Sequence, residues 1–128
     1  MIERILAPGA PEPRGPYSHA VRAGDFIYVS GQVAINPQTN KLEQGTVASE
    51  TRMTIENVRA ILKAAGADLG DVIKCSVFLA DIRDFAAMNE VYGEYFGAAK
   101  PARTTVQATL PAQGIKVEID CVAYKPTK

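Results

Sequence analysis

Two stretches together decide the fold prediction. They are Pro101-Ala102-Arg103-Thr104-Thr105 and Lys116-Val117-Glu118-Ile119-Asp120. Two strand-like runs, residues 104–110 and 115–124, flank a turn that contains both proline and glycine, so the pattern predicts a β-hairpin. Because side chains alternate between the two faces of a strand, Arg103 and Glu118 are expected on one polar face. A guanidinium there can bind a carboxylate, and an acid can handle a proton or a water molecule. The alternative, a polar face that is only solvated, remains open.

Length and composition indicate one globular domain, which we predict over residues 1–128. Apolar residues make up 47% and charged residues 22% of the chain, which is typical of a folded domain. The 14 basic residues balance the 14 acidic residues without forming a basic stripe, so no nucleic-acid partner is expected. The chain shows no signal-peptide core before Pro8 and no run long enough to span a membrane. A cytoplasmic location without membrane attachment is therefore predicted.

Cysteine and histidine usage gives no sign of a metal site or a cofactor. Cys75 and Cys121 lie inside apolar strand patterns and are interpreted as small core residues rather than reactive thiols. His19 is the single histidine, and no cluster of Cys, Asp and Glu has the spacing of metal ligands. The chain also lacks a Gly-rich phosphate loop.

Hydrophobic periodicity predicts a mixture of hairpins and helices. In chain order we expect a Pro- and Gly-rich loop over 7–16, a hairpin over 17–30, a short hairpin over 32–43, a helix from Thr46 to Gly66, a strand over 72–79, a helix from Asp81 or Asp84 to Gly97, and the hairpin over 104–124. The first helix has Ile55, Val58, Leu62 and Ala65 on one stripe, and its charged residues, Glu50 among them, are expected to face elsewhere. The 72–79 strand is expected to place Ile73, Cys75, Val77 and Leu79 on one face.

The predicted fold class is α+β, with both amphipathic helices packed on the same face of the sheet. The opposite face also carries apolar side chains, because residues 26–29 are apolar on both sides of their strand and Phe78 projects opposite Val77. A closed homo-oligomer that packs these sheet faces together would cover them.

Eight short blocks, in order along the chain, resemble the RidA/YjgF family of reactive-intermediate deaminases. They are Gly15-Pro16-Tyr17-Ser18, Ser30-Gly31-Gln32, Asn57-Val58, Ala64-Ala65-Gly66, Asp84-Phe85, Asn89, Pro101-Ala102-Arg103 and Val117-Glu118-Ile119. The resemblance implies a chorismate-mutase-like α+β fold assembled as a homotrimer, with ligand sites in the clefts between subunits. It also implies hydrolysis of small enamine and imine carboxylates, of the 2-aminoacrylate and 2-aminocrotonate type, to 2-keto acids and ammonia, without a cofactor or metal.

The resemblance also implies roles for particular residues. Arg103 aligns with an arginine that grips the substrate carboxylate, which its planar fork suits better than lysine would. Glu118 aligns with a glutamate near the attacking water, and partial burial would raise its pKa toward a useful range. Tyr17 aligns with a tyrosine of the pocket. The remaining pocket or supporting positions are Ser30, Gly31, Asn89 and Thr105.

Three positions depart from the family pattern. Thr105 stands where many members carry cysteine, His19 where many carry glutamine, and Lys100 where an aromatic residue often stands. Thr105 still offers backbone groups and a hydroxyl, whereas Lys100 puts the substrate preference in question. His19 is interpreted as a structural residue rather than a general base.

Other functions remain open. One is a non-catalytic module that binds 2-keto acids or related carboxylates through the same arginine. Another is a pathway-specific deaminase of the aminomuconate type. Family members have also been proposed as RNases or translation inhibitors, and the neutral charge balance argues against tight RNA binding.

Overall fold

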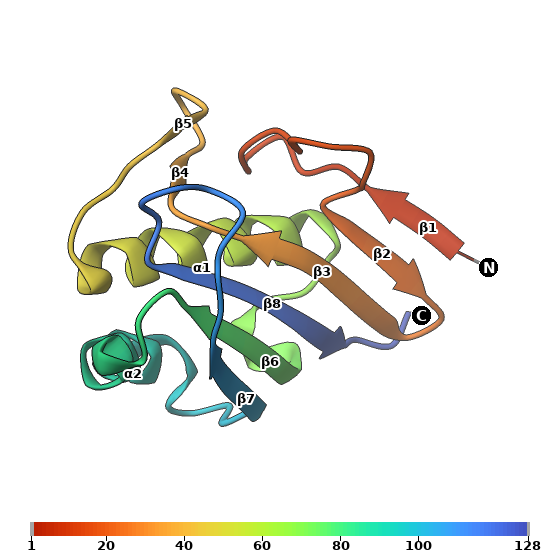
Figure 1. Cartoon of the computed structure of the whole chain (residues 1–128). Coiled ribbons are helices and arrows are strands. Elements are labelled where there is room, and N and C mark those ends of the chain that lie inside the picture. The colour runs from red at the N-terminus through yellow and green to blue at the C-terminus, as the bar shows by residue number, and fades with distance from the viewer. Residues whose placement is uncertain (1, 128) are drawn as a thin grey trace.

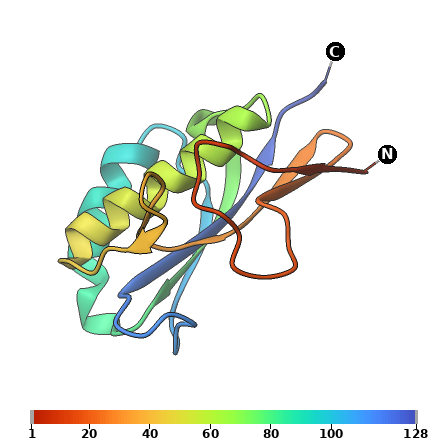
Figure 2. The ribbon, with the colours of Figure 1, turned by 90° about the horizontal axis from the view of Figure 1, so that it is seen from above.

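The sheet and its helices form two layers in the computed structural model, which describes residues 2–127. Two helices, α1 (Val47–Ala64) and α2 (Phe85–Phe96), lie on one side of a mixed sheet (Figures 1 and 2). The strands follow one another across the sheet in the order β1 (Ile2–Ile5), β2 (Ala20–Ala23), β3 (Phe26–Gln32), β8 (Val117–Tyr124), β6 (Val72–Leu79) and β7 (Ala102–Gln107). A separate small hairpin consists of β4 (Ile35–Asn36) and β5 (Lys41–Leu42). The predicted α+β class is confirmed.

The β2–β3 hairpin and helix α1 form where the sequence predicts them. Gly24 turns between β2 and β3 with a φ of 62°, a left-handed conformation that glycine adopts without strain. The Thr46 side chain accepts a hydrogen bond from the Ser49 amide and caps the N-terminus of α1. Ile55, Val58 and Leu62 are fully buried against the sheet. Local signals were therefore sufficient for these two elements.

The predicted hairpin over 104–124 does not form. β7 pairs only with β6, in parallel, whereas β8 pairs with β6 and β3 in antiparallel fashion. The β6–α2–β7 unit explains this, because a crossover through a helix makes two strands parallel neighbours and leaves the other edge of β6 for β8. The connection from β7 to β8 consequently crosses the end of β6, where Ala108 and Lys116 bond to the Leu79–Ala80 backbone (Figure 1). β1, at the far edge, was not predicted.

Two side chains lie on the opposite side from the one expected. Glu50 is fully buried, because its Oε1 accepts a hydrogen bond of 2.8 Å from the Lys116 amide and its Oε2 lies 3.4 Å from the Lys116 ammonium. Ile73 is 45% exposed, because the register between β6 and β8 shifts between Val72 and Lys74. The prediction of core cysteines is confirmed, since Cys75 and Cys121 are buried directly opposite each other in β6 and β8.

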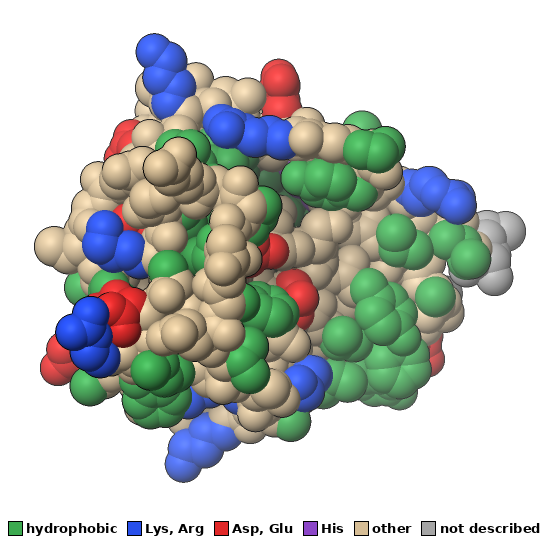
Figure 3. Space-filling model, in the orientation of Figure 1, with side chains coloured by type: hydrophobic (Ala, Val, Ile, Leu, Met, Phe, Trp, Pro, Cys, Tyr) green, Lys and Arg blue, Asp and Glu red, His purple; other side chains and the backbone are tan. Residues whose placement is uncertain are grey.

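The sheet face away from the helices carries exposed apolar side chains. Phe26, Tyr28 and Tyr124 are 39%, 50% and 44% exposed, and the Phe26 and Tyr124 rings pack edge to face with centroids 5.3 Å apart. Hydrophobic side chains gather at one side of the space-filling view (Figure 3). The expected uncovered apolar surface is present, and its cover by further copies of the chain stays a prediction. Within residues 2–127, neither helix is long and apolar enough to cross a bilayer.

Candidate active site

Arg103 on β7 is surrounded by side chains of α2. We call Arg103, Asn89 and Thr105 the arginine cluster. Arg103 Nη1 donates a hydrogen bond of 2.7 Å to Asn89 Oδ1. The guanidinium carbon lies 4.6 Å from the centroid of the Tyr92 ring and 5.5 Å from that of Phe85. These contacts hold the cation in place, and within residues 2–127 it forms no ion pair with an acid. Its positive charge therefore remains available to an anion.

The spacing of these α2 residues follows from the helix. Phe85, Asn89 and Tyr92 stand at i, i+4 and i+7 of α2, so they share one helical face. β7 brings Arg103 against that face, since Arg103 lies directly opposite the buried Cys75 of β6. The same side of β7 carries Thr105, whose hydroxyl is buried without a hydrogen-bond partner in the described chain. Because that hydroxyl is covered by protein, Thr105 offers a ligand its backbone rather than its side chain.

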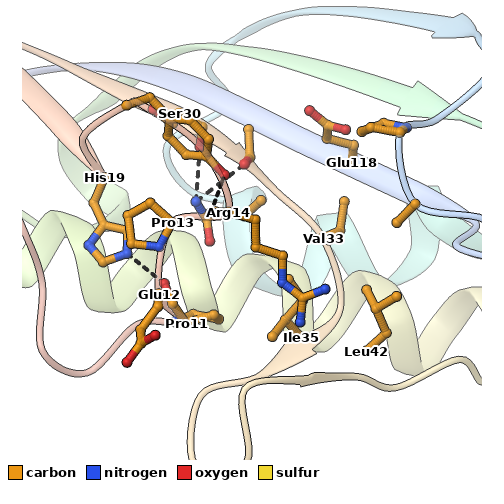
Figure 4. A pocket seen from close by; sticks show the side chains of 15 residues that line it. Pro11, Glu12, Pro13, Arg14, His19, Ser30, Val33, Ile35, Leu42 and Glu118 are labelled. Atoms are coloured by element: carbon orange, nitrogen blue, oxygen red, sulfur yellow. Dashed lines mark hydrogen bonds between the residues drawn. The ribbon is translucent and has the colours of Figure 1, made fainter.

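A cleft of about 640 Å³ brings together four other predicted residues, Tyr17, Ser30, Gly31 and Glu118, which we call the cleft cluster. Ser30 and Glu118 lie at its upper side in the close-up view (Figure 4). The cleft is further lined by the 11–14 segment, by Val33, Ile35 and Leu42, and by Pro111 and Ala112 of the β7–β8 connection. The crossing connection that replaced the expected hairpin thus supplies one wall of the cleft.

A bulge in β3 places Gly31 under the Glu118 carboxylate. The register between β3 and β8 shifts between Val29 and Gln32, so that Ser30 and Gly31 form the bulge. A methyl group at position 31 would overlap Glu118 Oε2. Only glycine at position 31 therefore leaves room for the Glu118 carboxylate in its observed position.

The Glu118 carboxyl is partly removed from water. Burial raises its pKa above the ordinary value of 4.5, and the negative charge of Asp120, two residues along the same strand face, adds to the rise. In the described chain no cation forms an ion pair with Glu118. A carboxyl with a raised pKa is suited to exchanging a proton with a bound water molecule.

Hydrogen bonds fix the loop that borders the cleft. His19 is 3% exposed; its Nδ1 accepts from the Ala7 amide at 2.7 Å, and its Nε2 lies 2.6 Å from the Pro11 carbonyl, to which it donates. Both ring nitrogens are occupied, which agrees with the structural interpretation of His19. The Tyr17 hydroxyl accepts from the Arg14 amide at 3.2 Å, and Ser30 Oγ donates to the Ser18 carbonyl at 2.7 Å. The Ser30 hydroxyl thus supports the cleft backbone.

The two clusters lie on opposite faces of the sheet within one protomer. Arg103 is in register with Cys75 and Cys121, whereas Glu118 is in register with Phe78. Residues 118 and 121 differ by an odd number of positions on β8, so their side chains point to opposite faces. The expectation that Arg103 and Glu118 share a polar face is therefore wrong for a single protomer, because it rested on a hairpin that does not form.

Comparison with known proteins assigns the chain to a family. A model of the family described as Endoribonuclease L-PSP matches residues 8–125. The chain belongs to this family. A RutC family protein of Pyrococcus horikoshii is 48% identical over 125 residues, covering 98% of this chain and 99% of that protein. The L-PSP family is the YjgF/RidA family, so the resemblance found in the eight sequence blocks is confirmed.

Two relatives have descriptions of a different kind from that of the family. The human 2-iminobutanoate/2-iminopropanoate deaminase is 42% identical over 126 residues, covering 98% of this chain and 92% of that protein. The crystal structure of E. coli TdcF with bound serine superposes with a TM-score of 0.89 at 38% identity, covering 96% of this chain and 98% of that chain. The descriptions of both relatives mention small molecules, whereas the family description names an endoribonuclease, an enzyme that cleaves RNA.

Sequence reasoning missed two features of the site. The aromatic cage that Tyr92 and Phe85 form around Arg103 was not predicted, although their i, i+7 spacing, with Asn89 at i+4, was visible in the sequence. Arg14, a lining residue of the cleft, had no signal in a loop of prolines and glycines. No group of three or more His, Cys, Asp and Glu side chains within residues 2–127 is arranged to hold a metal ion.

Proposed function

We propose that this L-PSP family member hydrolyses small imine and enamine carboxylates to 2-keto acids and ammonia. The observation that carries the proposal is the Arg103 guanidinium, which aromatic rings and a neutral amide hold in place and which no acid within residues 2–127 neutralises. Such a cation suits a ligand carboxylate, which can accept two parallel hydrogen bonds from the guanidinium. The deaminase name of the human relative supports the reaction class.

The chemistry balances with water as the only co-reactant. An enamine first takes a proton on its β-carbon and loses one from its nitrogen, which gives the imine. Glu118 orients a water molecule and accepts its proton while the water oxygen bonds to the imine carbon. The electron pair of the carbon–nitrogen double bond moves to nitrogen, which takes this proton and gives a carbinolamine. The hydroxyl proton then passes to nitrogen through Glu118 as the carbon–nitrogen bond breaks, so that ammonia leaves and the carbon–oxygen double bond of the 2-keto acid forms. In this scheme Arg103 anchors the carboxylate, Tyr17 and the backbone near Ser30 and Gly31 line the site, and Asn89 positions Arg103.

A complete site requires two copies of the chain in this proposal. The arginine cluster and the cleft cluster face away from each other in one protomer, so the arginine of one copy is proposed to meet the cleft of the next. A cyclic assembly does this repeatedly, because each interface joins one patch to a different patch on the neighbour. The exposed face with Phe26, Tyr28 and Tyr124 would be covered in the same ring. We propose a homotrimer.

Imine loss in a coupled assay tests the reaction directly. A dehydratase that acts on serine or threonine supplies the imine, and semicarbazide traps what remains. We expect the purified protein to lower the trapped imine, and Arg103→Ala to lower kcat/KM by about 100-fold, since two charge-assisted hydrogen bonds are lost. Saturable binding of a 2-keto acid without turnover would overturn the enzymatic proposal and favour a carboxylate-binding module.

Subunit complementation tests the shared site. Arg103→Ala and Glu118→Gln chains are co-expressed with two different affinity tags, and particles that carry both tags are isolated. In a mixed ring of three, one interface combines an intact Arg103 with an intact Glu118, so about one third of the wild-type activity is expected. A dimer would give about one half. Particles made of differently tagged Arg103→Ala chains serve as the inactive control, and inactive mixed particles would contradict a site shared between copies.

A further inference from the structure

A second arginine, Arg14, lies at the cleft. It is the only lysine or arginine among the described residues that line this cavity, and it enters from the loop rather than from the sheet. One of its side-chain nitrogens, Nη2, donates a hydrogen bond of 2.6 Å to the Asn40 carbonyl. Within residues 2–127 Arg14 forms no ion pair. A guanidinium carries five N–H donors, so most of its hydrogen-bonding capacity and all of its charge remain available.

The backbone that carries Arg14 is docked at several points. The Glu12 amide donates to Asn40 Oδ1 at 3.0 Å, and the Arg14 amide donates to the Tyr17 hydroxyl at 3.2 Å. Asn40 itself has a φ of 60°, a left-handed turn conformation that asparagine tolerates. The loop and the β4–β5 turn therefore brace each other. The backbone at Arg14 is therefore fixed by hydrogen bonds, and this fixes where its side chain enters the cleft.

The cavity has two polar ends with an apolar stretch between them. Figure 4 shows Glu118 and the Arg14 guanidinium on opposite sides of the cavity, with Val33 between them and Ile35 and Leu42 beside the guanidinium. A ligand with its reacting carbon near Glu118 would extend short methylene groups along the apolar wall and end at Arg14. A negative group is the complement of that end.

The acids near the cleft do not neutralise Arg14. The two acidic residues among its lining are Glu12 and Glu118. Figure 4 shows the Glu12 carboxylate directed away from Arg14 and the Glu118 carboxylate at the other end. The charge of Arg14 is thus separated from both.

We propose that Arg14 determines specificity by binding a second carboxylate on the substrate, so that imines and enamines of 2-oxo dicarboxylates are preferred over uncharged alkyl analogues. This inference rests on the proposed function, in which Arg103 of a neighbouring copy binds the first carboxylate. Arg14 acts on the distal end of the substrate and takes no part in the proton transfers.

Two imines with the same five-carbon skeleton test the inference. An amino-acid oxidase generates one from L-glutamate and the other from L-norvaline, and semicarbazide competition measures their hydrolysis. The wild-type protein is expected to favour the glutamate-derived imine about tenfold in kcat/KM, the effect of one charge-assisted contact in a partly exposed site. Arg14→Met should remove this preference, and Arg14→Lys should retain part of it, because lysine keeps the charge without the planar fork.

Arg83→Met is the matched control for loss of a surface cation. Arg83 is paired with Asp81 on the 3₁₀ turn Ile82–Asp84, and its side chain is 87% exposed. Its replacement should leave the preference unchanged. Circular dichroism of Arg14→Met checks that the variant is folded. Equal kcat/KM values for the two imines in the wild-type protein, or the same ratio in Arg14→Met, would overturn the inference.

A binding measurement separates this inference from the proposed function. If neither imine is hydrolysed faster with the wild-type protein, the proposed function fails, and calorimetry with 2-oxoglutarate and 2-oxopentanoate decides the role of Arg14 alone. Weaker binding of 2-oxoglutarate by Arg14→Met, relative to 2-oxopentanoate, supports a second carboxylate site. The same relative affinity in both proteins excludes it.

Discussion

The arginine cluster and the cleft cluster are built in opposite ways. Regular elements hold Arg103, because one face of α2 supplies the rings and the amide that fix its position on β7. Irregular backbone surrounds the Glu118 carboxylate, because a bulge in β3, a glycine and a crossing loop lie around it, although Glu118 itself stands on the regular strand β8. The first arrangement keeps a charge in place for an anion, and the second raises the pKa of an acid. This difference indicates that anchoring and proton transfer are sensitive to different substitutions.

Gly31→Ala should break the cleft cluster while leaving the arginine cluster intact. The new methyl group would overlap Glu118 Oε2, and the flexible end of that side chain would move to relieve the overlap. We expect a loss of about 100-fold in kcat/KM, because displacement of a catalytic group by about 1 Å has effects of this size. Thermal unfolding should change little, since the backbone itself meets no clash.

Gly93→Ala is the matched control for this substitution. A methyl group at position 93 meets nothing within 4 Å, and the position lies in helix α2, where alanine is favoured over glycine by about 1 kcal/mol. Activity should be retained and the melting temperature should not fall. Full activity of Gly31→Ala would show that the position of Glu118 is not critical.

Asn89→Ala and Asn89→Asp probe the arginine cluster in two steps. Alanine removes the acceptor that holds Arg103 Nη1, and KM should rise about tenfold through the loss of one hydrogen bond to a charged group. Aspartate keeps an acceptor but supplies a negative charge that competes with the substrate carboxylate. We therefore expect a larger rise in KM for aspartate, measured by initial rates, with kcat affected less than KM in both variants. A rise in KM that is smaller for aspartate than for alanine would mean that Arg103 needs only orientation and not a free charge.

The fold was predictable wherever the deciding signal was local. The glycine of the β2–β3 turn and the Thr46 cap of α1 each act on residues within four positions, and both elements formed as expected. Strand pairing depended on distant residues instead. The turn at 111–114 suggested a hairpin, but β8 pairs with β3 on one edge and with β6 on the other, so no edge of β8 remains for β7. Glu50 was likewise assigned to solvent because its partner, Lys116, lies 66 positions away.

The candidate site was predictable as a set of residues and not as an arrangement. The resemblance selected Arg103 and Glu118, and the structure gives each a suitable environment. Their separation onto opposite faces followed from strand order, which residue alternation alone does not determine. Arg14 was missed because no periodicity governs a loop of prolines and glycines, so only its docking on Asn40 reveals its place in the cleft.

A smaller effect is expected on the pH at which the cleft cluster becomes active. If Glu118 accepts a proton from water, kcat/KM should rise with pH through the pKa of Glu118, which burial and Asp120 raise above 4.5. Asp120→Asn removes the second of these causes and should move the acidic limb of the pH profile to lower pH, whereas burial, the larger cause, keeps the pKa raised. A limb that does not move would mean that Asp120 is too well screened by water to affect Glu118.

The same raised pKa predicts how stability changes when Glu118 is replaced. The native protein accommodates the protonated carboxyl more easily than the carboxylate, so the stability that this group contributes is present below 4.5 and is lost as the pH rises through its folded pKa. Glu118→Gln keeps a neutral side chain of similar shape at every pH. The variant should therefore unfold at a slightly higher temperature than wild type near pH 7, and the difference should shrink below 4.5. Melting curves at both pH values, with Asp120→Asn as the comparison, measure this, and a lower melting temperature for Glu118→Gln near pH 7 would show that the carboxylate is stabilised in the cleft rather than strained by it.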